Sequence, residues 1–339
     1  MSARRTLFAA SAATVLCCGA APAGAVVVTL NSVRDNTLYQ DATGSVSNGA
    51  GVYMFAGRTQ FAGVRRALVR FDVAGALGGG ARVNSAALTL TATQNRELPA
   101  EIALHRAAAD WGEGASDAGL PGGRGAPAAA GDATWIHRAF GTTDLWSTPG
   151  GDFAPDASAS EIVSLAGVYT WQSTAPLVAD VQAWASAPAG NFGWLIRGGN
   201  EDEPVSAKRF ATREDPEPEN RPRLVIDYTV GGDATLDNRV NLADFNVLAA
   251  NFGQSGRTFE QGDFNLDTVV NLADFNILAS NFGFDANTPT TAPPEWGPTS
   301  GFVPEPAALP VVAVLAATMA RHPQARSRRR AKHGNIDAG

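Results

Sequence analysis

The feature that most constrains this chain is a short segment that occurs twice. Residues 241–253 and 271–283 are identical at 11 of 13 positions, at an offset of 30 residues. The two differences, Val247/Ile277 and Ala250/Ser280, are conservative. A unit this short cannot bury a core alone, so the duplication predicts two small elements that pack against each other.

Oxygen-bearing residues recur at fixed positions just before and within each copy. Counted from a leading aspartate, positions 1, 3, 5, 9 and 12 hold Asp233, Thr235, Asp237, Asn241 and Asp244, and then Asp263, Asn265, Asp267, Asn271 and Asp274. This is the ligand spacing of an EF-hand loop, in which position 7, here Arg239 and Val269, offers its backbone carbonyl. Hard oxygen donors favour calcium. We therefore predict two calcium sites, the first weaker because Thr235 replaces a carboxylate or amide.

Each predicted loop leads into a short amphipathic helix. Apolar residues recur at spacings of three and four, at Leu242, Phe245, Leu248 and Phe252 and again at Leu272, Phe275, Leu278 and Phe282. Residues 231–283 hold six Asp and one Glu against two Arg, a balance of −5 that a bound cation would offset. The alternative interpretation is a pair of Asp/Asn-rich turns that cap ordinary helices.

The loop, the single following helix and the duplication resemble a type I dockerin, in which position 12 is commonly Asp, as here. The resemblance implies a small α-helical, EF-hand-like domain over 231–284 and a cohesin-like module or another surface protein as its partner. Two departures stand out. Position 6, usually Gly, holds Asn238 and Thr268, and the pairs Leu242-Ala243 and Leu272-Ala273 replace the usual Ser-Thr that helps to choose the cohesin.

Residues 26–230 show short alternating apolar runs separated by Gly, Pro, Asn and Asp. This pattern predicts about ten strands and an all-β sandwich. The expected strands cover 26–30, 52–57, 66–73, 86–93, 101–107, 133–140, 169–173, 193–198, 208–213 and 223–230. One helix is expected over 177–188, and the acidic runs 201–203 and 214–219 are expected to be solvated loops.

Several of these stretches follow one another as they do in DNRLRE domains. They include "DNTLYQD" (35–41), "RRALVRFDV" (65–73), "LHRAAADWGEG" (104–114) and "RPRLVIDY" (221–228). The resemblance implies a jelly-roll β-sandwich related to polysaccharide-binding modules, and a family that is mostly non-catalytic.

Tryptophans and carboxylates are the candidate functional groups of this β region. Trp111 and Trp146 lie in Gly-rich or polar loops and are candidate stacking surfaces for a polysaccharide, whereas Trp135, Trp171 and Trp194 lie within strand patterns and are expected in the core. A glycosidase pair would need two facing carboxylates. The spacing singles out no pair among Asp110, Glu113, Asp132 and Glu214.

Both ends of the chain carry targeting signals. Residues 1–25 have Arg4 and Arg5, an apolar stretch and a small-x-small site at Ala23 and Ala25, which predicts a signal peptide cleaved after Ala25 rather than a buried N-terminal helix. Residues 285–302 read as a linker. The segment 303–330, with a basic tail to 339, resembles a PEP-CTERM sorting signal: Val303-Pro304-Glu305-Pro306, a short apolar stretch and an arginine cluster. It implies transient membrane contact and processing by an exosortase-type enzyme.

The net charge of −7 argues against nucleic acid as a partner. Together these features predict a mainly β chain, a jelly-roll sandwich followed by a small helical domain. They predict an exported, non-catalytic protein of the cell surface or outer envelope, binding polysaccharide and docking through calcium. A secreted polysaccharide-degrading enzyme, either a glycoside hydrolase or a lyase, and a structural extracellular-matrix protein are the alternatives.

Overall fold

The computed structural model describes residues 25–60, 63–94, 98–202 and 204–286. Almost all of the predicted signal peptide, including Ala23, and all of the sorting segment 303–330 lie outside the described residues, as does the linker beyond residue 286. Within the described part of the chain, no helix is long and apolar enough to cross a membrane.

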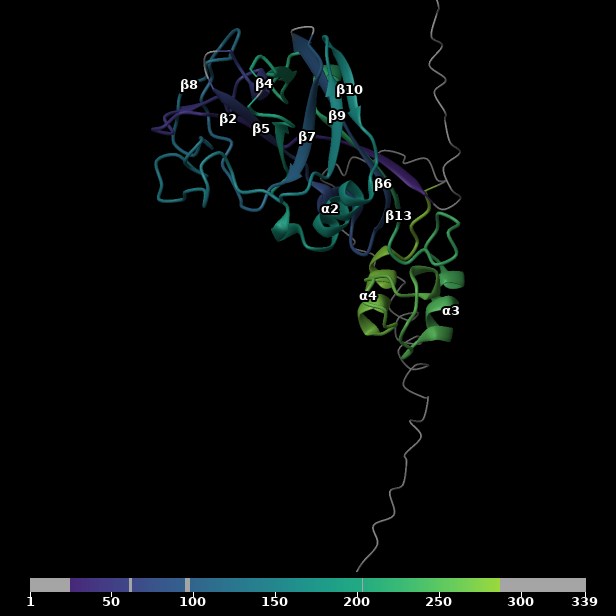
Figure 1. Cartoon of the computed structure of the whole chain (residues 1–339). Helices are drawn as coiled ribbons and strands as arrows, with labels where there is room; N and C mark the ends of the chain where they lie inside the picture. Colours follow the sequence, from purple (N-terminus) through teal and green to yellow (C-terminus); the bar gives the residue numbers. More distant parts are fainter. Residues whose placement is uncertain (1–24, 61–62, 95–97, 203, 287–339) are drawn as a thin grey trace, which may run out of the picture. The chain divides into compact units, whose positions relative to one another are not determined.

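The protein is mainly β, with a large antiparallel sheet and few helices, consistent with the predicted β-sandwich (Figure 1). Eleven strands form this sheet and β3 and β8 form a separate pair. The strands are β1 Val26–Asn31, β2 Arg34–Tyr39, β3 Val46–Ser47, β4 Tyr53–Arg58, β5 Val64–Arg70, β6 Arg82–Gln94, β7 Ala100–Arg106, β8 Ala126–Pro127, β9 Ala159–Val163, β10 Gly167–Trp171, β11 Trp194–Gly198, β12 Lys208–Ala211 and β13 Arg223–Thr229.

The strand order is β1-β13-β6-β12-β4-β5-β11-β7-β9, with β10 paired to β6 and β2 paired to β5. β4 pairs with β12 on one side and β5 on the other, so it joins two groups of strands. Because side chains alternate along each strand, each group buries one face. Trp171, Trp194 and Phe210 are fully buried, which confirms two of the predicted core tryptophans.

A second apolar cluster lies on the other face of β5, β2 and β11. Leu38, Leu68 and Leu195 from these strands contact Trp135 and Ala133 from the long segment that follows β7. Residues 133–140, predicted as a strand, are bends and irregular backbone in the structure, with one isolated bridge between His137 and Leu145. Apolar residues do alternate in this segment of the sequence. Their side chains cover the face formed by β2, β5 and β11, and the backbone does not pair as a further strand of the sheet.

Few helices accompany the sheet. α2 spans Ala175–Ser186, close to the predicted 177–188, and packs against β6 at one end of the sheet (Figure 1). It starts two residues earlier because Thr174 caps it, accepting a bond from the backbone of Leu177, and Pro176 fits the first turn. The remaining short helices of this region are α1 Val73–Leu77, η1 Pro188–Gly190 and η2 Pro218–Asn220.

The duplicated segment forms two helices that lie side by side, α3 Leu242–Asn251 and α4 Leu272–Asn281, with η3 Phe259–Gln261 between them (Figure 1). Leu248 and Leu278 are buried, and Phe245 meets Phe275 edge to face at 6.4 Å. The four other residues of the predicted apolar faces are exposed, so that part of the prediction was wrong. The core is closed instead by Val240, Val270, Phe259 and Phe264.

Candidate functional site

The first loop folds around the carboxylate of Asp233, which is buried. Its Oδ1 accepts a hydrogen bond from the backbone N–H of Asp237 at 3.1 Å, and its Oδ2 accepts one from that of Asn238 at 3.0 Å. These bonds bend the backbone of residues 233–238 around position 1. The loop is therefore wrapped about its own leading carboxylate.

The carboxylate of Asp244 closes the other side of the loop and is also buried. Its Oδ1 accepts bonds from the backbone N–H and the hydroxyl of Thr235, at 3.0 and 2.9 Å. Its Oδ2 accepts a bond from the backbone N–H of Asn241 at 2.8 Å, which completes a capping box at the start of α3. One side chain thus fixes both the loop and the first turn of the helix.

The second loop repeats this arrangement. Four bonds between 2.9 and 3.1 Å join the carboxylates of Asp263 and Asp274 to the backbone N–H groups of Asp267, Thr268, Asn265 and Asn271. Asp274 closes the capping box of α4. The two copies share one geometry as well as one sequence.

The carboxylates converge most closely in the first loop. One oxygen each of Asp233, Asp237 and Asp244 lie within 4.8 Å of one another, a donor set that could hold a hard cation. Among the described residues, the second loop does not form such a close group. There, Asp267 Oδ2 accepts a bond from the amide of Asn265 at 2.8 Å. That the first site binds calcium more weakly than the second stays a prediction. The close approach of three carboxylates in the first loop does not support that prediction.

Crowded carboxylates hold protons more tightly than isolated ones. Burial, with added repulsion from Asp244 and Asp237, raises the pKa of Asp233 to about 6. Burial likewise raises the pKa of Asp263, with Asp274 and Asp267 adding repulsion. A bound cation would relieve this repulsion, so the residues present fit a metal ion.

The sharp turn at position 6 is made without glycine. Asn238 has φ 65° and Thr268 has φ 71°, both in the left-handed region that glycine normally fills. Asn adopts this conformation readily, whereas β-branched Thr does so with strain. The loops thus reach the EF-hand turn despite the unusual residues, and the second loop stores strain there.

Replacing Thr268 by glycine should release this strain. We expect Thr268→Gly to raise the free energy of unfolding by about 1 kcal/mol, because the strained turn belongs to the folded chain. Urea unfolding of the full chain measures this change. Asn238→Gly is the matched control and should gain less, because Asn tolerates a positive φ. A lower free energy of unfolding in Thr268→Gly would contradict the strain argument.

The remaining predicted ligands have partners of their own. The side-chain oxygens of Asn241 and Asn271 accept bonds from the backbone of Ala243 and Ala273, at 2.8 and 2.7 Å, and so cap the two helices. The carbonyl oxygen of Val269 accepts a bond from the Asn271 amide at 3.2 Å. Ligation by these residues, and by the carbonyl of Arg239, stays a prediction.

Each loop pairs with the segment that follows the other repeat's helix. Val240 donates to the carbonyl of Phe284 at 3.0 Å and accepts from Gly283 at 2.8 Å. The equivalent bonds of the second loop, of the same lengths, join Val270 to Gln254 and Gly253. The backbone of each loop is therefore complete only when both repeats are folded.

The two tryptophans that were predicted as stacking surfaces for a polysaccharide are buried in the structure, so that prediction was wrong. Trp111 is 2% exposed and donates its indole N–H to the carbonyl of Phe192, and Trp146 is 5% exposed and donates to that of Thr134, both at 2.8 Å. Both belong to the apolar cluster that covers β2, β5 and β11. Neither ring is free to stack on a sugar, because the loops that carry them fold back onto the sheet.

The candidate catalytic carboxylates also have partners. Asp132 is buried and accepts backbone bonds, and Asp110 is exposed beside Arg70 at 3.2 Å. Glu113 and Glu214 come close together, and both contact Arg213, at 2.7 and 2.9 Å. The structure therefore brings together one pair that the sequence could not single out.

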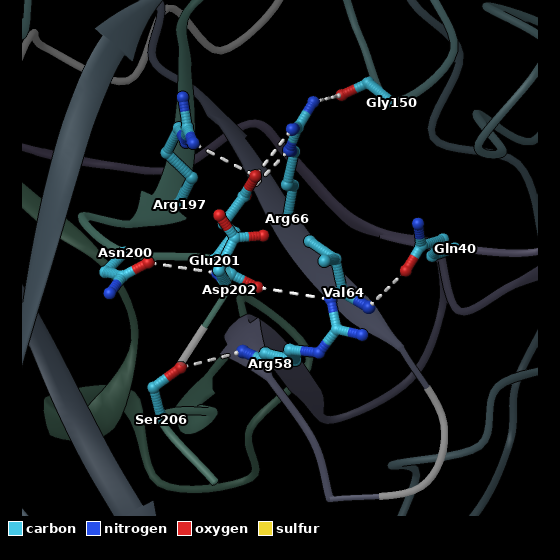
Figure 2. A network of polar contacts seen from close by, with 10 residues as sticks. All are labelled: Gln40, Arg58, Val64, Arg66, Gly150, Arg197, Asn200, Glu201, Asp202 and Ser206. Carbon is cyan, nitrogen blue, oxygen red and sulfur yellow. Dashed lines mark hydrogen bonds and ion pairs between the residues drawn. The ribbon is translucent and has the colours of Figure 1, made fainter. Parts of the chain in front are cut away.

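The acidic runs are less solvated than predicted. Glu201 is clamped by Arg66, whose Nε and Nη2 donate at 2.8 and 2.6 Å, and by Arg197 at 3.0 Å (Figure 2). These side chains are largely buried, and Asp215 of the second run is buried too. The network ties β5 to the segment after β11, and Glu201 supplies the counter-charge for Arg66 and Arg197.

Comparison with known proteins gives a likeness that is limited to a small part of the chain. The chain matches no protein-family model and no curated protein. A solved structure described as a type II cohesin-dockerin domain from Bacteroides cellolosolvens is similar over 17% of this chain and 93% of its own length. The two share 37% sequence identity, and the TM-score is 0.16.

Proposed function

We propose that this chain is an exported, non-catalytic binding and assembly protein whose duplicated segment is a calcium-dependent docking module of the dockerin type. The observation that carries the proposal is the pair of equivalent loops, each wrapped around buried aspartates at positions 1 and 12. Asp/Asn-rich turns that only cap helices would need the second of these aspartates and not the first.

Calcium is the cation that suits these loops best. The donors are carboxylates, amides, a hydroxyl and backbone carbonyls, all of them hard oxygen ligands. The two buried aspartates of each loop take their bonds from backbone N–H groups, so they are already positioned. When bound, calcium would offset the local negative charge and hold each loop against the first turn of its helix.

Exposed leucines mark the proposed docking surface. Leu242 and Leu272, at the first turns of α3 and α4, are 59% and 60% exposed. Phe252 and Phe282, at the C-terminal caps of the same helices, are also exposed. Large apolar side chains exposed at equivalent places in both copies fit an apolar face on a cohesin-like module or another surface protein.

A charge in place of these leucines should weaken docking and leave calcium binding intact. For Leu242→Arg/Leu272→Arg we expect a loss of roughly 30-fold or more in affinity for a cohesin module, the effect of losing a 2 kcal/mol interface anchor. Biolayer interferometry against a panel of type I and type II cohesins, in calcium and in EGTA, measures it. Val27→Arg/Val168→Arg, at equally exposed sandwich positions, is the matched control. Calcium-independent binding, or none to any cohesin, would contradict the docking role.

For the β region we propose a jelly-roll of the DNRLRE type with polysaccharide as ligand. A cleft of about 430 Å³, lined by Arg106, Phe153, Trp184 and Phe192 among others, offers apolar and cationic groups for a sugar chain. Export through a signal peptide and surface sorting through the PEP-CTERM-like tail are proposed on the sequence alone.

Two assays on the same purified protein separate this proposal from its alternatives. Binding on a glycan array without release of reducing sugar supports a binding module. Sugar release would show a polysaccharide-degrading enzyme instead, and the close pair Glu113 and Glu214 would then be the first residues to replace. Silence in both assays would favour a structural matrix protein.

A further inference from the structure

A second group of carboxylates meets in the β region, outside the duplicated segment. Asp35 lies on β2, Glu113 follows β7, and Glu214 lies three residues after the end of β12. One carboxylate oxygen from each lies within 4.8 Å of the others. The backbone N–H of Asp35 donates to Glu113 Oε1 at 2.9 Å, so two of the three segments are joined directly.

Two oxygens of this group are buried without a hydrogen-bond partner. Asp35 is 0% exposed, and its Oδ2 accepts bonds from Ser32 Oγ at 3.3 Å and from the backbone of Arg213 at 2.9 Å. Its Oδ1 accepts none, and neither does Oε2 of Glu214. Burying a carboxylate oxygen that has lost its water without gaining a hydrogen-bond donor costs free energy of folding. Each such oxygen therefore calls for an explanation, such as a bound ion.

The surrounding charges leave this group electronegative. Arg213 donates to both oxygens of Glu113, each at 2.7 Å, and lies 2.9 Å from Glu214 Oε1. The nearby Arg34 is turned to the carbonyl of Trp111 and to Asp110. Three carboxylates against one guanidinium leave two negative charges, which one divalent cation would cancel.

We propose that Asp35, Glu113 and Glu214 form a third cation site, which binds calcium within the β region. Carboxylates are ligands of hard cations. Calcium accepts several of them, mono- or bidentate, at irregular angles, whereas magnesium usually keeps most of its water and takes one or two. Bound there, the ion would fasten β2 to the segments after β7 and β12. Burial, with added repulsion from Glu214, raises the pKa of Asp35 well above its usual range although Arg213 lies nearby.

The rival explanation is that a proton, not a metal, sits between Asp35 and Glu214. The metal site and the shared proton predict different effects of calcium on the folded chain. A metal site predicts a bound ion and a calcium-dependent rise in thermal stability of the β region. A shared proton predicts neither.

The test starts from the full chain carrying Asp233→Asn and Asp263→Asn, which removes the two repeat sites. Native mass spectrometry in calcium chloride is expected to find one calcium per chain, against three in the unaltered protein. Adding Asp35→Asn or, separately, Glu214→Gln should remove that last ion and the calcium-dependent shift of the unfolding temperature followed by tryptophan fluorescence. Adding Asp110→Asn, an exposed carboxylate of the neighbouring loop, should retain both.

Near-ultraviolet circular dichroism shows which variants are folded. Asp35→Asn and Glu214→Gln are both made, so that the test can still be read if one of them does not fold. The inference is overturned if the folded chain without repeat sites binds no calcium, or if a folded Asp35→Asn or Glu214→Gln variant still binds it. Two ions in the unaltered chain that are both lost in Asp233→Asn/Asp263→Asn would overturn this site and leave the repeat sites standing. A single ion in the unaltered chain that also survives Asp233→Asn/Asp263→Asn would instead support this site and contradict the repeat sites.

Discussion

Asp233→Asn/Asp263→Asn is expected to weaken calcium binding by the duplicated segment roughly 100-fold to 1,000-fold, because each loop loses the charge around which its backbone is wrapped. The asparagine keeps one acceptor oxygen but not the charge that a divalent ion needs. Since the core of the two repeats is small, α3 and α4 should lose helical structure at calcium concentrations that saturate the unaltered protein. Calorimetric titration gives the affinity and far-ultraviolet circular dichroism gives the helix content.

Asp156→Asn/Asp202→Asn is the control for this experiment, because it removes two exposed charges elsewhere in the chain. It should leave both measurements unchanged. If the variant without Asp233 and Asp263 bound as many calcium ions as the unaltered protein and kept its helix content, the loops would be helix-capping turns only, and the docking proposal would lose its basis.

Glu201→Gln is expected to destabilise the folded protein by about 3 kcal/mol, the lower end of the cost of breaking a buried ion pair. Glutamine leaves the guanidinium groups of Arg66 and Arg197 without their counter-charge in a place that water hardly reaches. Arg66 would keep its bond to the carbonyl of Gly150 (Figure 2). It would also keep its contact with the ring of Trp135. The loss of stability should therefore come chiefly from charge and not from packing.

Urea unfolding monitored by tryptophan fluorescence measures this change as a shift of the midpoint at constant slope. Asp202→Asn, one residue further along the chain and exposed, should stay within about 0.5 kcal/mol of the unaltered protein. A similar small effect of Glu201→Gln would show that the cluster in Figure 2 is solvated in solution, as the sequence alone suggests.

The helices and most strands followed from local patterns in the sequence. Nine of the ten expected strand segments contain a strand, and the helix expected over 177–188 is displaced by two residues. The failure at 133–140 is instructive, because alternation reports that every second residue meets an apolar surface, not that the backbone pairs. Ala133 and Trp135, two residues apart, meet such a surface, which β2, β5 and β11 provide.

The candidate sites followed from the sequence only where their residues are close together in the chain. The loop aspartates could be predicted because an EF-hand loop is twelve residues long and carries its own ligands. The burial of Trp111 and Trp146 could not, since it depends on how a long segment folds back over strands that come before and after it. The meeting of Asp35 with Glu113 and Glu214 depends on the strand order, which no local pattern encodes.

The two repeats exchange backbone hydrogen bonds, between Val240 and Phe284 and between Val270 and Gln254. The duplicated segment must therefore be kept or transferred as one unit. Deleting either copy would remove the backbone partner of the loop in the remaining copy, so one copy alone is not expected to fold. We expect that grafts onto other proteins must carry residues 231–286 whole, and that a single copy moved alone behaves as an unstructured peptide.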